Sequence, residues 1–175
     1  TYYRTYGTTL RGLMLEHELP PDDFLAYVHE IDVTVLAPNP RLVAALDRIP
    51  GRRLVFTNGS ARHAENVLNH LGLADHFDAI FDIKAADYIP KPAAETYHRM
   101  VETFAIEPSQ AVMFEDLAHN LVVPHELGMT TVWVREEGHS FAEGPDPEDL
   151  SFIDHTTDDL PGWIDDWISK TIPKS

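Results

Sequence analysis

Residues 52–60 read RRLVFTNGS, and the interpretation of the rest of the chain starts from this stretch. Three apolar residues, Leu54–Phe56, predict a short buried strand, and a polar run from Thr57 to Ser60 follows directly. Asn-Gly is typical of a turn, and Ser60 precedes an apolar-periodic stretch that ends at Gly72, as a helix does. A strand, a polar turn and a helix in this order indicate an α/β protein.

The same alternation continues along the chain. Short apolar strands alternate with amphipathic helices, which predicts a mostly parallel sheet with helices on both faces. The two proline-interrupted stretches before residue 32 predict two short helices outside this sheet. The strands are expected at 54–56, 79–81, 111–114, 131–134 and, at the edge, 152–153. Helices are also expected at 41–49, from residue 61 to Gly72, and from Pro92 onward. A further helix is expected after the strand at 111–114, ending at Gly128, and a last one at 160–168.

Composition narrows the classes of function. The 175 residues carry 13 Lys and Arg against 29 Asp and Glu, a formal charge of −16, so a nucleic-acid polymer is not expected as partner. The chain has no cysteine, which excludes disulfides and thiolate sites and fits the cytoplasm. No apolar run reaches membrane-spanning length, so no membrane partner is expected. A small anionic substrate is compatible with this acidic composition, because a metal and one lysine can form a local positive pocket.

The turn after the first of these strands contains groups suited to a phosphoryl oxygen. In parallel sheets, ligands bind at the carboxyl ends of the strands. Thr57 offers a hydroxyl, Asn58 a carboxamide, and Gly59 an accessible backbone N–H at the start of a helix. A plain turn followed by a helix cap is the alternative, since these residue types are common in both.

A lysine lies before the helix that starts at Pro92, and two acids lie at the end of the third predicted strand, 111–114. Lys91 lies between two prolines, which predicts a rigid extended loop, although a surface lysine beside a helix start is the alternative. Glu115 and Asp116 directly follow four apolar residues, and Asn120 comes one turn later. Adjacent hard oxygen ligands at this place suit Mg²⁺. Capping of the next helix by Asp116 is the alternative.

In combination, these features resemble the second, third and fourth motifs of the haloacid dehalogenase (HAD) superfamily. The resemblance implies a Rossmann-like three-layer fold and a Mg²⁺-dependent phosphomonoester hydrolase that acts on a small phosphorylated metabolite through an aspartyl-phosphate. It implies that the turn Thr57–Gly59 binds the phosphoryl group and that Lys91 neutralises charge. It also implies Asp116 and Glu115 as metal ligands, supported by Asn120.

The N-terminal stretches indicate a subgroup. Residues 2–10, 24–32 and 50–60 are similar to the pyrimidine 5′-nucleotidase-like HAD proteins, which implies a nucleoside 5′-monophosphate as a candidate substrate. Residues 1–36 are then expected to form part of a helical cap, and residues 37–175 the α/β core.

The family's first motif, Asp-x-Asp on the first strand, has no counterpart in residues 1–175, so we expect a longer native protein. Glu30-Ile31-Asp32 resembles that motif but follows a stretch with helical periodicity, where the cap's last helix is expected. Two other functions stay open: a 2-haloacid dehalogenase, which needs no Mg²⁺, and a non-catalytic ligand-binding protein without its nucleophile.

Overall fold

The computed structural model describes residues 2–6, 8–28, 31–135 and 149–171, and the chain divides into two compact units, Thr1–Pro90 and Lys91–Ser175. The first unit contains α1 (Tyr2–Tyr6), α2 (Thr9–His17), α3 (Pro21–Val28), the 3-10 helix η1 (Val33–Val35), α4 (Pro40–Arg48), β1 (Leu54–Phe56), α5 (Ala61–Leu71), η2 (Ala74–His76) and β2 (Ala79–Phe81). The second contains α6 (Ala94–Thr103), η3 (Pro108–Gln110), β3 (Val112–Glu115), η4 (Ala118–Leu121), α7 (Val122–Glu126), β4 (Thr130–Val134), β5 (His155–Thr157) and α8 (Leu160–Thr171).

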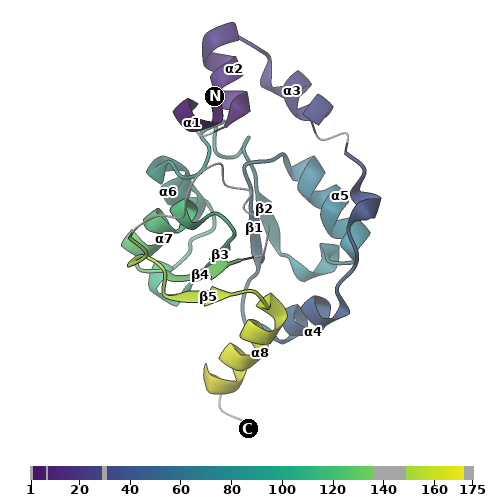
Figure 1. Cartoon of the computed structure of the whole chain (residues 1–175), viewed down its shortest axis with the longest axis vertical. Coiled ribbons are helices and arrows are strands. Elements are labelled where there is room, and N and C mark those ends of the chain that lie inside the picture. The colour runs from purple at the N-terminus through teal and green to yellow at the C-terminus, as the bar shows by residue number, and fades with distance from the viewer. Residues whose placement is uncertain (1, 7, 29–30, 136–148, 172–175) are drawn as a thin grey trace. The chain divides into compact units, whose positions relative to one another are not determined.

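In the first unit, β1 and β2 lie side by side and pair in parallel, with Leu54 opposite Ala79 and Phe56 opposite Phe81 (Figure 1). The rings of Phe56 and Phe81 meet edge to face, with centroids 5.5 Å apart. Helix α5 begins and ends as predicted. The Ser60 hydroxyl accepts the His63 N–H at its start, and Gly72 ends it with a left-handed φ of +70°.

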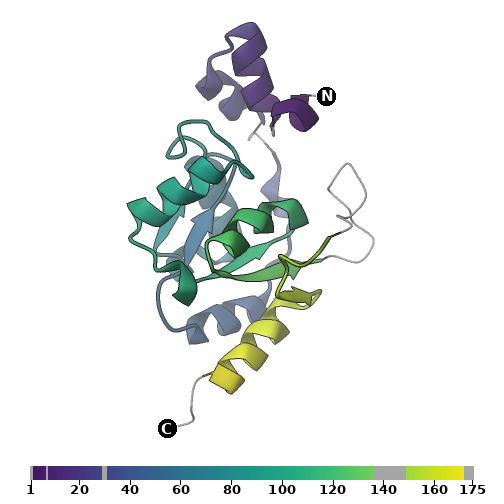
Figure 2. The ribbon, with the colours of Figure 1, turned by 90° about the vertical axis from the view of Figure 1, so that its left-hand side faces the viewer.

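The N-terminal part of this unit forms three helices, whereas the sequence predicted two (Figure 2). Helices α1 and α2 are separate because the Thr8 hydroxyl caps α2 by accepting the Arg11 N–H at 3.1 Å. The two helices pack closely at Gly12, where an added Cβ would lie 2.6 Å from the side chain of Tyr2. Glycine at this position therefore allows the contact between α1 and α2.

In the second unit, β3, β4 and β5 form a parallel sheet in that order. Two predicted boundaries were wrong here. The edge strand is His155–Thr157, not 152–153, because Phe152 and Ile153 pack against the cluster of Ala118, Leu121 and Trp133 instead. Helix α6 begins at Ala94, not Pro92, because Ala93 has an extended backbone, with ψ of 126°, and takes the N-cap position.

The predicted fold class, α/β with parallel strands, is confirmed. Within the described residues, β1 pairs with β2 alone and β3 with β4 alone, so each of the two lies at an edge of its sheet. The strand expected to carry the family's Asp-x-Asp motif stays a prediction. Of the helices that the structure describes, none has the length and apolar character needed to cross a bilayer.

Candidate functional site

The turn Thr57–Ser60 leaves the carboxyl end of β1 and lies in the first unit. Its first residue extends the sheet, because the Thr57 N–H donates to the Phe81 carbonyl at 3.0 Å. The Gly59 N–H donates to the Thr57 hydroxyl oxygen at 2.9 Å. Two of the predicted phosphate-binding groups are therefore bonded to each other. The Thr57 hydroxyl still has a hydrogen to donate, since it acts as acceptor in this bond. Asn58 is partly buried in the same turn.

Asp82 organises this turn, and the sequence analysis missed it. Its carboxylate is buried, with 8% of the residue exposed, and one oxygen accepts the Ala61 N–H at the start of α5 at 2.8 Å. The other oxygen accepts the N–H groups of Lys84 and Ala85 at 3.1 and 2.9 Å. Asp82 directly follows the apolar strand Ala79–Phe81. The pattern that drew attention to Glu115, an acid after an apolar strand, could have identified it.

In the second unit, Lys91 and Glu115 form a buried ion pair. The Lys91 Nζ lies 2.5 Å from the Glu115 Oε2, and the two side chains are 9% and 7% exposed. Burial alone would raise the pKa of Glu115, but the Lys91 charge and hydrogen bonds to the carboxylate bring it below its ordinary value. Glu115 is therefore ionised at neutral pH, and its position at the end of β3 fixes the Lys91 ammonium.

Asp116, the next residue, is exposed. Partial desolvation, followed by the nearby Glu115 carboxylate, raises the pKa of Asp116. Its backbone carbonyl accepts the Trp133 indole N–H at 2.9 Å, which fixes the chain at this point. Two carboxylates are thus held close together, one paired with a lysine and one open to solvent.

Asn120 lies nearby and is almost completely buried, with 2% exposed. Its backbone carbonyl accepts the Tyr97 hydroxyl at 2.8 Å, and a hydrogen bond between its side chain and Glu115 helps to lower the pKa of that carboxyl. The Asn120 Oδ1 has no hydrogen-bond partner among the described residues. The buried position and the contact with Glu115 agree with the supporting role predicted for Asn120, which stays a prediction.

The donor set fits Mg²⁺. This ion commonly takes one or two carboxylates and completes its shell with water and substrate phosphate. Desolvation and, after it, the neighbouring Glu115 raise the Asp116 pKa, and a bound cation would favour the ionised form of both carboxyl groups. Of the two carboxylates, Asp116 is the one that would be accessible to the ion, because the Glu115 Oε2 is engaged by Lys91. Within the part of the chain that the structure describes, no three His, Asp or Glu side chains gather closely enough to hold a metal by themselves.

The structure thus brings together the predicted residues of each unit separately. Thr57, Asn58 and Gly59 form one turn of the first unit, and Lys91, Glu115, Asp116 and Asn120 gather at the end of β3 in the second.

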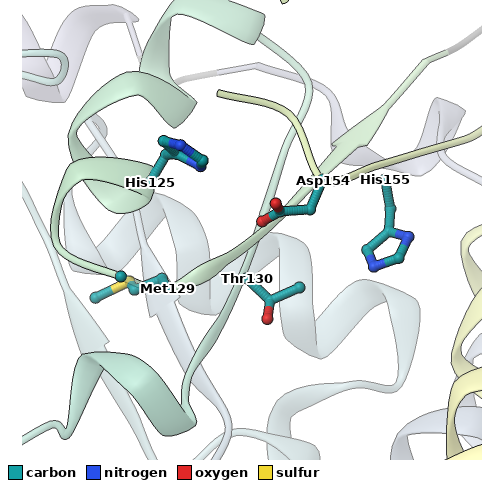
Figure 3. A pocket seen from close by; sticks show the side chains of 6 residues that line it. His125, Met129, Thr130, Asp154 and His155 are labelled. Carbon is teal, nitrogen blue, oxygen red and sulfur yellow. The ribbon is translucent and has the colours of Figure 1, made fainter. Parts of the chain in front are cut away.

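An open cavity of about 580 Å³ lies elsewhere in the second unit (Figure 3). It is lined by His125, Gly128, Met129, Thr130, Asp154 and His155. Thr130 and His155 begin β4 and β5, so this cavity is at the amino ends of these strands. Glu115, by contrast, ends β3. Since ligands of such sheets bind at the carboxyl ends, the cavity is not the predicted site.

Comparisons with known proteins identify the family and the fold. A family model described as haloacid dehalogenase-like hydrolase matches residues 3–121. The chain is 37% identical over 89 residues to fructose-1-phosphate phosphatase YqaB of Escherichia coli (strain K12), a match that covers 49% of this chain and 46% of that protein. The chain therefore spans about half the length of this curated relative.

Two solved structures show the same fold. One is the L-2-haloacid dehalogenase from Xanthobacter autotrophicus with chloropropionic acid covalently bound, with a TM-score of 0.63 at 18% identity, covering 96% of this chain and 76% of that one. The other is a HAD phosphatase from Thermococcus onnurineus, with a TM-score of 0.55 at 21% identity, covering 83% and 63%. Since the family model matches more than half of its residues, the chain belongs to the haloacid dehalogenase-like hydrolase family.

Proposed function

We propose that the protein is a Mg²⁺-dependent phosphomonoester hydrolase that acts on a small phosphorylated metabolite. The observation that carries the proposal is the buried Lys91–Glu115 pair beside the exposed Asp116 at the end of β3. A fixed ammonium next to an accessible carboxylate suits a phosphoryl group bound together with a divalent cation. The curated relative, named a fructose-1-phosphate phosphatase, supports the same class of reaction.

In this proposal Asp116 holds Mg²⁺, which supplies charge neutralisation to the phosphoryl group when bound. Glu115 aligns the Lys91 ammonium, and Lys91 stabilises the charge that develops during transfer. By the family resemblance, Thr57, Asn58 and Gly59 bind phosphoryl oxygens, and hydrolysis proceeds through an aspartyl-phosphate. Residues 1–36 are proposed as part of the cap, and residues 37–175 as the core.

For the substrate, we propose a sugar phosphate ahead of a nucleoside 5′-monophosphate. The sugar phosphate is favoured by the name of the curated relative. The nucleotide is favoured by the resemblance of residues 2–10 and 24–32 to the nucleotidase-like subgroup.

The test is phosphate release by the protein expressed from its own gene. We expect release from fructose 1-phosphate or a nucleoside monophosphate with Mg²⁺, and its loss with EDTA. Asp116→Asn should lower kcat/KM by about 100-fold or more, the scale of a group that stabilises transition-state charge. Asp75→Asn, which neutralises an exposed acid on η2, is the matched control and should have no effect.

Two results would contradict the proposal. Halide release from a 2-haloacid that persists in EDTA would identify a dehalogenase. Binding of Mg²⁺ or inorganic phosphate without turnover of any phosphomonoester would identify a ligand-binding protein.

A further inference from the structure

The loop of residues 82–90, which follows β2, packs against the N-terminal helices within the first unit (Figures 1 and 2). Leu10 of α2, Leu25 of α3 and Ile83 of the loop form a buried apolar cluster, with exposures of 5%, 5% and 1%. Three partly buried side chains pack around it: Met14, Phe24 and Tyr88. The helices are therefore docked on this loop by a small apolar core of their own.

Polar contacts surround that core. The Arg11 Nη1 donates to the Tyr88 carbonyl at 3.2 Å. The Lys84 Nζ lies 2.5 Å from the Asp22 Oδ1, with the two side chains 47% and 68% exposed. The Tyr88 hydroxyl also donates to the Asp22 carboxylate, at 3.4 Å. Both α2 and α3 are thus attached to the loop by a charged side chain.

The loop has a defined conformation at these attachment points. The Tyr88 N–H donates to the Ile83 carbonyl at 2.8 Å, and the Asp87 N–H to the Lys84 carbonyl at 2.9 Å. Asp87 and Tyr88 both have left-handed backbones, with φ of 54° and 59°. Consecutive non-glycine residues in this region are costly and persist only where surrounding contacts maintain them. The helices supply contacts to Tyr88, so their docking helps to maintain the shape of the loop.

The other side of the loop is bonded to the Thr57–Ser60 turn. The Ile83 N–H donates to the Gly59 carbonyl at 3.1 Å, and Asp82 accepts from Ala61 directly after that turn at 2.8 Å. Ile83 therefore contacts both the helices, through its side chain, and the proposed phosphate-binding turn, through its backbone. Displacement of α2 and α3 would therefore alter the position of that turn.

We propose that the Asp22–Lys84 ion pair and the Arg11–Tyr88 hydrogen bond form a latch that keeps α2 and α3 docked on the 82–90 loop. Through this loop, Arg11, Asp22 and Lys84 act as positioning residues for the proposed phosphate-binding turn. This role rests on the proposed phosphatase function, whereas the latch itself does not.

A charge swap tests the latch. Asp22→Lys and Lys84→Asp each place like charges together, and the double variant restores an opposite pair. The readout is the inhibition constant of inorganic phosphate, measured in the hydrolysis of p-nitrophenyl phosphate, because this constant reports phosphate binding at the Thr57–Ser60 turn. We expect each single variant to raise this constant by about fivefold, the scale of an exposed pair, and the double variant to return it to within about twofold of the wild-type value.

The matched control is Glu95→Lys, which reverses one partner of the exposed Glu95–Arg99 pair on α6 and should leave the inhibition constant unchanged. An unchanged constant in the single variants, or no recovery in the double variant, would overturn the proposal.

Amide hydrogen exchange in α2 and α3 separates this proposal from the phosphatase function. Exchange should be faster in each single variant and return to the wild-type rate in the double variant. If the wild type hydrolyses no phosphomonoester, the phosphatase proposal fails and the positioning role fails with it, while this exchange pattern still supports the latch. Unchanged exchange in all variants overturns the latch itself.

Discussion

Two lysine–carboxylate pairs in this molecule have the same separation but very different surroundings. The lysine Nζ lies 2.5 Å from a carboxylate oxygen in both pairs, Lys91–Glu115 and Lys84–Asp22. The first pair is 9% and 7% exposed, and the second is 47% and 68% exposed. Loss of one buried partner leaves a charge without solvent, whereas water and salt replace an exposed partner. Burial, not distance, therefore determines how much stability is lost when one partner of each pair is removed.

The pKa shifts express the same difference. In the exposed pair, the mutual hydrogen bond lowers the pKa of Asp22 and raises that of Lys84. In the buried pair, desolvation opposes ionisation of Glu115, yet its pKa still lies below the ordinary value because Lys91 is adjacent. The buried carboxylate depends on its lysine to stay charged.

The largest expected effect follows removal of the buried lysine. Lys91→Met should lower the free energy of unfolding by about 3 kcal/mol, because it leaves Glu115 buried without its partner. Phosphatase activity should fall by about 100-fold or more, since the charge proposed to stabilise the phosphoryl group is lost. Urea unfolding and phosphate release measure the two effects. The double variant Lys91→Met/Glu115→Leu should recover most of the stability and none of the activity. Wild-type stability in the single variant would show that burial does not determine the stability lost when an ion-pair partner is removed.

A smaller effect is expected at Asp82, a buried carboxylate that accepts backbone hydrogen bonds in place of an ion pair. Asp82→Ala leaves the N–H groups of Ala61, Lys84 and Ala85 without this acceptor. We expect a loss of about 2 kcal/mol in urea unfolding. Asp82→Asn, which keeps one acceptor oxygen, is the control and should lose less. Equal losses in the two variants would mean that the side-chain volume matters more than its oxygens.

Removal of a buried hydrogen bond between neutral groups should lower the stability less again. Tyr97 has no exposed surface, and its hydroxyl donates to the Asn120 carbonyl at 2.8 Å. Tyr97→Phe should cost about 1 kcal/mol in thermal unfolding, because the hydrogen bond to the Asn120 carbonyl joins two neutral groups. A cost as large as that of Lys91→Met would break the ranking of charged above neutral contacts.

The smallest effect is expected for the exposed pair. Asp22→Asn should change thermal stability slightly at low salt and not at all near 1 M salt, where charges are screened within about 3 Å. Since the folded-state pKa of Asp22 is lowered, its stabilisation is present above the unfolded value of about 3.9 and disappears as the pH falls below it. A difference that persists at high salt and at low pH would show that this pair behaves like the buried one.

The sequence predicted much of the fold because strand and helix periodicity is local. The strands at 54–56 and 79–81 and the helix before Gly72 needed only neighbouring residues for their prediction. Pairings between distant residues were not predictable in this way. Glu115 was predicted as a metal ligand from its place after a strand, but its contact with Lys91, 24 residues away, depends on tertiary packing. Asp82 was missed although it follows a strand in the same manner.

The most direct test of the proposed site is the Mg²⁺ dependence of phosphate release from fructose 1-phosphate by the wild type and by Asp116→Asn. The account predicts a saturable Mg²⁺ requirement in the wild type. It predicts, in the variant, a requirement shifted to much higher Mg²⁺ or activity abolished at every concentration. Equal activity of the two proteins at all Mg²⁺ concentrations would contradict the assignment of Asp116 as the metal ligand.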